Sequence, residues 1–365
     1  MISMNEAIDN KKDNPTMNVY KHHSLEEKEA IIRMIREEFP EGDLYWTYKS
    51  LDRIIKINGK PVSHHTINRI LKEEIGTFQI YCIGGHNFSI QIDATSSIIL
   101  KLSHYQLFRN EATPENKPLF HLSITKKHNL EIPDFIKQDI KQNVYFSEGA
   151  LYLVDRNEKD GSPLTILKTN KTFTQGKLSI INDPHLVFTK ANILRMYSIC
   201  TNTLKTIALH SAVVEYKQKS YLFLGKSGTG KSTHCRLWIK NIPGARIIND
   251  DQPVVRIHSD GTVWVYGTPW GGKSPKYCNE QYPIGGFVIL AQAPINEIHN
   301  ASGYEAYSSL WTSIIHYHPW ENNNNIQDFI VSIINSVPFW HFNCLPDDNA
   351  AILCCKTITN HQHII

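Results

Sequence analysis

The segment YLFLGKSGTGKST, residues 221–233, constrains the fold of this chain more than any other feature. It begins with an apolar run, continues with a glycine-rich loop, and leads into STHCRLWIKN, which is typical of a helix. The loop matches the pattern G-x-x-x-x-G-K-[ST], in which backbone N–H groups and a lysine surround phosphate oxygens. The sequence therefore predicts a buried strand, a phosphate-binding loop and a helix, in that order.

The residues of this loop have separable roles. Its glycines let the backbone wrap closely around phosphate oxygens at the positive end of the next helix. Lys231 supplies a mobile charge for the β- and γ-phosphates, and the Ser232 hydroxyl can ligate Mg²⁺. The alternative is a chance glycine turn between a strand and a helix. The candidate nucleotide-binding residues are Gly225, Lys226, Ser227, Gly228, Thr229, Gly230, Lys231, Ser232 and Thr233.

Two adjacent carboxylates come next in the chain. The segment ARIINDDQPVV predicts a short apolar strand with Asp250 and Asp251 at its end. One carboxylate could hold a metal ion while the other accepts the proton of an incoming hydroxyl, which suggests phosphoryl transfer. An Asp-Asp pair taken alone is more typical of a surface turn, and only the nearby phosphate loop favours the catalytic interpretation.

Two further candidates depend on the same loop. His210 ends ALH on what should be a neighbouring strand, where a histidine is more often packed than catalytic. GTPWGGK, residues 267–273, is a second glycine-rich loop. Its Lys273 is a candidate contact for phosphate or for the acceptor, although without the phosphate loop the segment would be read only as a turn.

The hydrophobic pattern divides the chain into three units. Residues 1–76 show three helical segments, the second of which ends at Asn58-Gly59, and residues 77–190 have the period of two that predicts a β-rich domain. Residues 191–365 alternate strand and helix signals. The expected strands are FQIYCI, FSIQID, IILKL, LFHLSI, VYFSEGALYLVD, LTILK, TIALHSAVVEY, IGGFVILAQA and AAILCC, and the expected helices near and after residue 190 are TKANILRMYSICTNTLK, SLWTSIIHY and IQDFIVSIINSV.

Charge and composition limit the partners. The formal net charge is only +3, and residues 1–76 hold 12 basic and 13 acidic side chains. Residues 45–74 are arranged like a helix-turn-helix, but without a basic surface they are better explained as a docking or packing module than as a DNA reader. Seven cysteines without a C-x-x-C pair indicate reduced thiols. Without a signal peptide or an apolar run of roughly 18 residues, we expect a cytoplasmic protein with no membrane partner.

Three motifs together resemble the HPr kinase/phosphorylase family, and most closely its relatives found beside peptide-modification genes. They are H-S-A-x-V near residue 210, G-K-S-G-T-G-K-S-T at 225–233 and N-D-D at 249–251, within a similarity that covers roughly residues 190–345. The resemblance implies a P-loop kinase core similar to that of phosphoenolpyruvate carboxykinase, with ATP and Mg²⁺ used to phosphorylate a serine hydroxyl.

By position, the resemblance implies roles for five residues. Lys231 would bind phosphate, Ser232 and Asp251 would bind the metal ion, Asp250 would be the base, and His210 would lie near the reacting phosphate. Thr233 stands where the bifunctional enzymes have a glutamate, and their glycine- and arginine-rich C-terminal signature is not found. Phosphorylase activity, the HPr substrate and a hexamer are therefore not implied, and the oligomeric state is left open.

The leading hypothesis is an ATP-dependent kinase that phosphorylates a Ser or Thr hydroxyl of a peptide or protein. A second hypothesis keeps the site but uses a small molecule, such as free serine or a phosphoenolpyruvate-type substrate. A third is a non-catalytic ATP sensor that reports through the β-rich domain. Turnover without a peptide would favour the second, and ATP binding without any phosphorylated product would favour the third.

Overall fold

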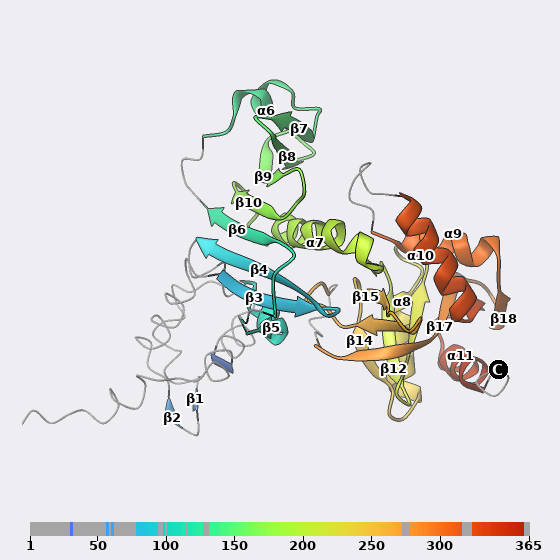
Figure 1. Ribbon diagram of the computed structural model, residues 1–365. Helices are drawn as coiled ribbons and strands as arrows, with labels where there is room; N and C mark the ends of the chain where they lie inside the picture. The colour runs from blue at the N-terminus through green and yellow to red at the C-terminus, as the bar shows by residue number, and fades with distance from the viewer. Residues whose placement is uncertain are drawn as a thin grey trace, which may run out of the picture.

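The computed structural model describes residues 30–31, 56–57, 60–61, 78–93, 98, 101–111, 113, 115–126, 131–271, 278–315 and 323–360 (Figure 1). In these ranges the chain is mixed α/β, with an eight-stranded sheet, a nine-stranded sheet and helices packed around them. The eight-stranded sheet comes from the first half of the chain, and the nine-stranded sheet comes from the second.

The eight-stranded sheet is mostly antiparallel, but its centre is parallel. Strand β6 pairs in parallel with both β4 and β10, and the remaining neighbours are antiparallel hairpins or returns. A short helix α6 (Asp134–Gln138) and the 3₁₀ helix η1 (Ser103–Phe108) connect parts of it. In spatial order the strands are β5 (Arg109–Asn110), β3 (Phe78–Ile83), β4 (His86–Asp93), β6 (His121–Lys126), β10 (Gln175–Ile180), β9 (Pro163–Asn170), β8 (Ala150–Arg156) and β7 (Val144–Ser147).

The nine-stranded sheet is organised around β17, its longest strand. The first residues of β17 pair antiparallel with β16, and the rest pair in parallel with β13 on one side and with β19 on the other. The strands are β11 (Thr206–Ala208), β15 (Val254–Ile257), β16 (Val263–Tyr266), β17 (Gln281–Gln292), β13 (Lys219–Leu224), β12 (Ala212–Tyr216) and β14 (Arg246–Asn249), with β19 (Phe339–Cys344) and β18 (Glu297–Ala301) branching from β17.

The alternation of side chains in β13 separates two hydrophobic cores. Leu222 and Leu224 belong to the core that holds α9 (Tyr304–Ser313) and α10 (Asn323–Ser336). Tyr221 and Phe223 belong to the other core, with α8 (Lys231–Asn241) and α11 (Asp348–Asn360). Since every side chain of β13 from Ser220 onward is buried, the strand is held from both faces, as in a parallel sheet covered by helices.

Helix α7 (Val187–Thr201) connects the two sheets (Figure 1). It contacts β9 and β10 of the first sheet and β11 of the second, and the short helix η2 (Asn202–Leu204) leads directly into β11. The Tyr197 hydroxyl donates to the Ile83 carbonyl at 2.9 Å, and the Arg256 guanidinium donates to the Gly84 carbonyl at 2.7 Å. The largest hydrophobic core continues across this junction, because it includes residues of both sheets.

Most of the expected elements near the phosphate loop are present. The strand and helix predicted on either side of it are β13 and α8, the strand before the two aspartates is β14, and the strand IGGFVILAQA lies in β17. The segment TIALHSAVVEY was expected as one strand, and it forms β11 and β12 with a break at residues 209–211. Strand β10 was not predicted.

Two predicted strands are helical instead. In AAILCC the buried residues Ala350, Ala351, Cys354 and Cys355 recur at helical spacing, and the Asp347 carboxylate accepts the Ala350 N–H at 2.8 Å as an N-cap of α11. In IILKL, Ile98 and Lys101 are helical, and the Leu102 N–H donates to the Ile98 carbonyl. Both errors arose because a short apolar run fits a buried strand and a buried helix equally well.

The expected N-terminal helices fall almost entirely outside the described residues. Two parts can be compared. Residues 30–31 are helical, as the sequence predicted. Lys56–Ile57 (β1) pairs antiparallel with Lys60–Pro61 (β2), where the sequence predicted the end of a helix. An Asn-Gly pair such as residues 58–59 favours a hairpin turn at least as strongly as a helix end, which explains the error.

Two expectations drawn from composition can also be compared. Within the described ranges, no helix has the length and apolar character that crossing a bilayer requires. All seven cysteines lie in the described part of the chain, and each carries a free thiol there.

The close packing of Gly286 in β17 against Trp340 in the neighbouring strand β19 gives a first prediction. A Cβ atom added at Gly286 would lie 2.1 Å from Cζ3 of the buried Trp340 ring, so Gly286→Ala should lower the free energy of unfolding by about 2 kcal/mol in urea denaturation. The matched control is Gly176→Ala, whose Cβ meets only the flexible ends of Leu122 and Met196 at 3.0 Å, and which should lose less. Equal losses in the two variants would contradict the packing argument.

Candidate active site

The glycine-rich loop leaves β13 with a sharp change of backbone direction. Gly225, Gly228 and Gly230 all have positive φ, and Gly230 is the N-cap of α8. At Gly225, where φ is 145°, a Cβ would lie 2.7 Å from Thr229 Oγ1 and 3.2 Å from the Leu290 carbonyl oxygen. The loop therefore needs glycine there for two reasons, its backbone conformation and the close approach of β17.

The Lys231 side chain folds back over this loop. Its Nζ donates to the carbonyl oxygens of Gly225 at 2.8 Å and of Lys226 at 3.3 Å. Burial lowers the pKa of Lys231, while the charges of Asp251 and Asp250 act in the opposite direction. The ammonium group is thus held at the loop with both carboxylates within electrostatic range.

A turn directly after β14 carries the two aspartates. Asn249 is the last residue of the strand and is fully buried. Its side-chain oxygen accepts the backbone N–H groups of Asp251 and Gln252, both at 2.9 Å. Because β13 and β14 both pair antiparallel with β12, they run in the same direction and end at the same edge of the sheet. The carboxylates therefore meet the phosphate loop there.

His210 reaches this edge through the break between β11 and β12. The Leu209 N–H donates to the Pro253 carbonyl at 3.0 Å, and the Ser211 N–H donates to the Asp251 carbonyl at 3.0 Å. The His210 N–H donates to the Ser313 carbonyl at the end of α9 at 2.6 Å. These bonds place His210 Nε2 3.6 Å from Asp251 Oδ1.

Burial weakens the charged form of both members of this pair. The pKa of His210 is lowered by burial and by the Lys231 charge, against the influence of Asp251. The pKa of Asp251 is raised by burial, against the influence of His210 and Lys231. The imidazole is therefore biased towards its neutral form.

The chemistry of the carboxylates fits a magnesium ion. Asp250 Oδ1 is buried and has no hydrogen-bond partner among the described residues, which is costly unless something else binds it. No cluster of three or more His, Cys, Asp or Glu side chains suited to a metal ion occurs within the described ranges. Mg²⁺ does not need such a cluster, because it commonly takes one or two carboxylates, waters and substrate phosphates. Asp251 and the Ser232 hydroxyl in the first turn of α8 would supply the protein ligands, with the Asp250 carboxylate beside them.

Two cavities adjoin the phosphate loop on the β17 and β19 side. One of about 620 Å³ lies between loop residues 225–229, the end of β17 and the polar residues Ser308, Ser309 and Thr312 of α9. The other, of about 350 Å³, lies between the start of α8 and residues 344–346. Gln292 lines both and donates from Nε2 to the Gly228 carbonyl at 3.1 Å. Together they leave room for a ligand beside the glycine-rich loop.

The second glycine-rich loop is anchored at both ends. At its start, Thr268 and Trp270 are buried beside the aspartate turn, and the Gln252 N–H donates to the Trp270 carbonyl at 3.2 Å. Lys273, the candidate contact in this loop, lies outside the described residues, so its predicted role stays a prediction.

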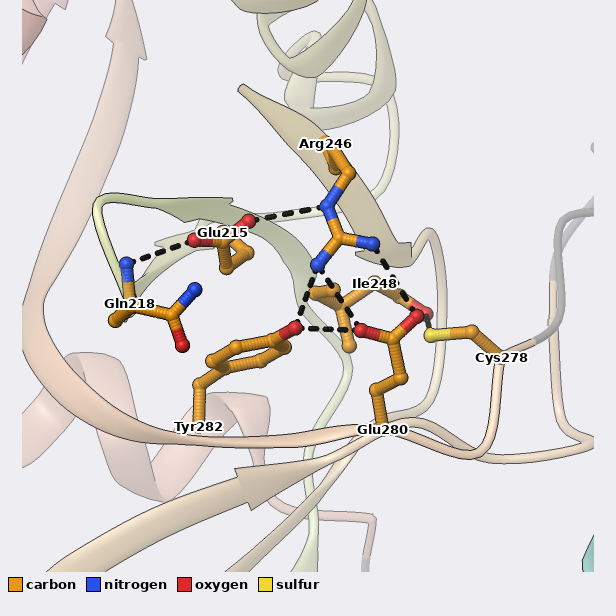
Figure 2. A network of polar contacts seen from close by, with 7 residues as sticks. All are labelled: Glu215, Gln218, Arg246, Ile248, Cys278, Glu280 and Tyr282. Atoms are coloured by element: carbon orange, nitrogen blue, oxygen red, sulfur yellow. Dashed lines mark hydrogen bonds and ion pairs between the residues drawn. The ribbon is translucent and has the colours of Figure 1, made fainter. Parts of the chain in front are cut away.

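Figure 2 shows the anchor at the other end of that loop. Arg246 of β14 pairs with Glu280 at 3.0 Å and with Glu215 at 3.2 Å, and it also donates to the Tyr282 hydroxyl. The Cys278 thiol donates to the Ile248 carbonyl at 3.1 Å. These contacts tie the chain just after the loop to the same strand that carries the aspartates, and they raise the pKa of Arg246.

The structure thus brings Lys231, Asp250, Asp251 and His210 together at one edge of the sheet. Sequence reasoning gave no role to Asn249, Thr268 or Gln292. Asn249 was visible as the first letter of N-D-D, and a buried amide before two acidic residues is a signal for a side chain that organises a turn. Thr268 and Gln292 carried no comparable signal, because their partners lie far away in the sequence.

Comparison with protein-family models finds no match, and no curated protein matches this chain. Among solved structures, the Hpr(Ser) kinase/phosphatase from Coxiella burnetii is similar over 42% of this chain and 95% of its own length, with 11% sequence identity and a TM-score of 0.27. A likeness at that TM-score carries no argument about this chain, so its function has to be inferred from its own residues.

A buried histidine in α8 gives a prediction on pH. His234 accepts the Trp238 indole N–H at 3.1 Å, and burial lowers its pKa to about 4 from 6.5. Because the pKa of His234 is lower in the folded state, the contribution of the neutral imidazole to the unfolding free energy is fully present above about pH 6.5 and is lost as the pH falls towards 4. His234→Gln keeps a hydrogen-bond acceptor but cannot bind a proton. Between pH 7 and 4.5, the unfolding free energy of this variant should therefore fall by about 2 kcal/mol less than that of the unmodified chain.

The control for this measurement is His185→Gln, which alters an exposed imidazole. Its urea-denaturation profile should match that of the unmodified chain over the same pH range. If His234→Gln shows the same pH dependence as this control, then burial of His234 does not contribute to acid sensitivity.

Proposed function

We propose that this protein is an ATP-dependent kinase that transfers the γ-phosphoryl group to a hydroxyl. The observation that carries the proposal is the meeting of the P-loop Lys231 with Asp250, whose buried oxygen has no hydrogen-bond partner in the described part of the chain. A carboxylate oxygen without a partner beside a phosphate loop is suited to accept a hydroxyl proton or to contact a metal ion. The three-part division into residues 1–76, 77–190 and 191–365, with a P-loop kinase core in the last, belongs to this proposal.

The residues would divide the reaction between them. The backbone N–H groups of the loop and Lys231 bind the phosphates, and Ser232 and Asp251 hold Mg²⁺, which when bound neutralises phosphate charge. The oxygen of the attacking hydroxyl bonds to the γ-phosphorus as the bond from that phosphorus to ADP breaks. Asp250 accepts the proton that the hydroxyl loses. His210, biased towards the neutral state, remains a hydrogen-bonding group at the site without competing with Lys231 for negative charge. Catalysis is then mainly alignment and charge stabilisation.

The acceptor we propose is a Ser or Thr hydroxyl of a peptide or protein. Support for this acceptor comes from the motif resemblance over residues 190–345. The carboxylate pair supports transfer to a hydroxyl, because it supplies one group for a metal ion and one for the hydroxyl proton. Free serine is the alternative acceptor, and a transfer assay has to include both.

Two substitutions should separate binding from transfer. Asp250→Asn should lower phosphoryl transfer from γ-labelled ATP by about 10²-fold or more, because the proton acceptor is lost, while ATP affinity by calorimetry stays nearly unchanged. Lys231→Ala should instead weaken ATP binding itself. Transfer is measured to a library of Ser- and Thr-containing peptides and, separately, to free serine.

The matched control is Asp260→Asn, which makes the same change at an exposed aspartate whose carboxylate caps Thr262 in the turn between β15 and β16. It should leave both transfer and binding unchanged. Retained transfer in Asp250→Asn would remove Asp250 as the base. ATP binding with no product from any acceptor, peptide or serine, would overturn the kinase proposal in favour of a nucleotide sensor.

A further inference from the structure

We propose that Asn249 and Thr268 are positioning residues that hold the Asp250–Asp251 pair in place and join it to the start of the second glycine-rich loop. The inference rests on the proposed function, since it assigns how that site keeps its carboxylates oriented. Both side chains have 0% exposure, so they act on the reaction through their neighbours rather than by touching a substrate.

Asn249 organises the turn from inside. Its Oδ1 accepts two successive backbone N–H groups, those of Asp251 and Gln252, at 2.9 Å each. An amide oxygen that binds the next N–H groups along the chain closes an Asx-type turn, which sets the direction in which the intervening side chains leave the backbone. The orientation of the Asp250 and Asp251 carboxylates therefore depends on the Asn249 amide.

The amide of Asn249 is in turn held by Thr268. Its Nδ2 donates to Thr268 Oγ1 at 2.9 Å, which fixes which end of the amide faces the turn. The same hydroxyl donates to the Gln252 carbonyl at 2.7 Å and accepts the Trp270 N–H at 3.2 Å. A hydroxyl has one proton to donate and two lone pairs, so all of its hydrogen-bonding capacity is used between the two segments.

This hydroxyl also connects the turn to the eight-stranded sheet. The Trp270 ring packs against Tyr197 of α7 with ring centroids 5.2 Å apart, and edge-on to Tyr105 of η1 at 6.3 Å. Trp270 is 3% exposed and belongs to the core that spans both sheets. The aspartate turn, the second loop and the sheet junction thus form one hydrogen-bonded and packed unit.

The physical consequence is that a hydroxyl with no access to solvent sets the geometry of the candidate catalytic pair. Removing a group that hydrogen-bonds to a metal-binding side chain and orients it typically lowers metal affinity or activity by about 10- to 100-fold. Thr268→Val keeps the shape of the side chain but leaves the Asn249 amide, the Trp270 N–H and the Gln252 carbonyl without this partner.

The test is hydrogen exchange combined with metal titration on the full chain. In Thr268→Val the amide protons of Asp251, Gln252 and Trp270 should exchange about tenfold faster, because each hydrogen bond is weakened or lost. In the presence of ADP, Mn²⁺ used as a probe for Mg²⁺ should bind about tenfold more weakly. ADP affinity measured without metal should not change, because the glycine loop is untouched.

Three variants keep the test falsifiable. Thr268→Ser retains the hydroxyl and should behave as the unmodified chain, and Thr268→Cys, with a weaker hydrogen-bonding group, should be intermediate and serves if the valine variant does not fold. The matched control is Thr165→Val, which removes an equally buried hydroxyl in β9 of the eight-stranded sheet, where it bonds to Asp155 and Asn192. It should lower the melting temperature without altering Mn²⁺ or ADP affinity.

The outcomes separate this inference from the proposed function. Unchanged amide exchange and Mn²⁺ affinity in Thr268→Val, or equal effects in Thr165→Val, would overturn the positioning role whether or not the protein transfers phosphate. If the unmodified chain binds ADP but no Mn²⁺, the proposed metal site fails, while the exchange of the Asp251 and Gln252 amides still decides whether Thr268 holds the turn.

Discussion

The rest of the structure depends on the hydrogen bonding of β17, which pairs with three other strands. Its first residues continue the antiparallel part of the sheet, and its longer second part runs parallel between β13 and β19. Parallel pairing with β13 brings the ends of both strands to one edge, so the phosphate loop and Gln292 become neighbours. The pairing needs Gly285 and Gly286, because the Tyr221 and Trp340 rings occupy the space of any side chain there.

The second condition for the site is the break between β11 and β12. A continuous strand would have kept its hydrogen bonds within the sheet. Instead, residues 209–211 bond to Asp251, Pro253 and Ser313, which brings His210 to the aspartate turn. Helix α7 enters this region directly through η2 and β11, so the packing of the eight-stranded sheet against α7 bears on the position of the same turn.

Much of the local structure around the loop could be predicted from the sequence, because periodicity and glycine placement are local signals. Strand β13, helix α8 and strand β14 are all indicated by the pattern of residues 221–249. The errors lie where a local signal is ambiguous. The AAILCC segment is apolar enough for a strand, and only the Asp347 cap and the packing of α11 on α8 decide for a helix. The single strand expected around His210 failed because the contacts that interrupt it come from distant segments.

The sequence by itself determined the backbone of the glycine-rich loop, since the glycines at 225, 228 and 230 adopt positive φ values that few other residues could adopt. It also placed two carboxylates at the end of a strand. Only the tertiary structure decided that Asp250, Asp251, His210 and Lys231 lie close together. It also decided that the buried Asn249 and Thr268 hold the aspartate turn through hydrogen bonds. The physical reason is the range of the interactions: glycine conformations act within a few residues, whereas hydrogen bonds such as Asn249–Thr268 form only after packing has brought separate strands together.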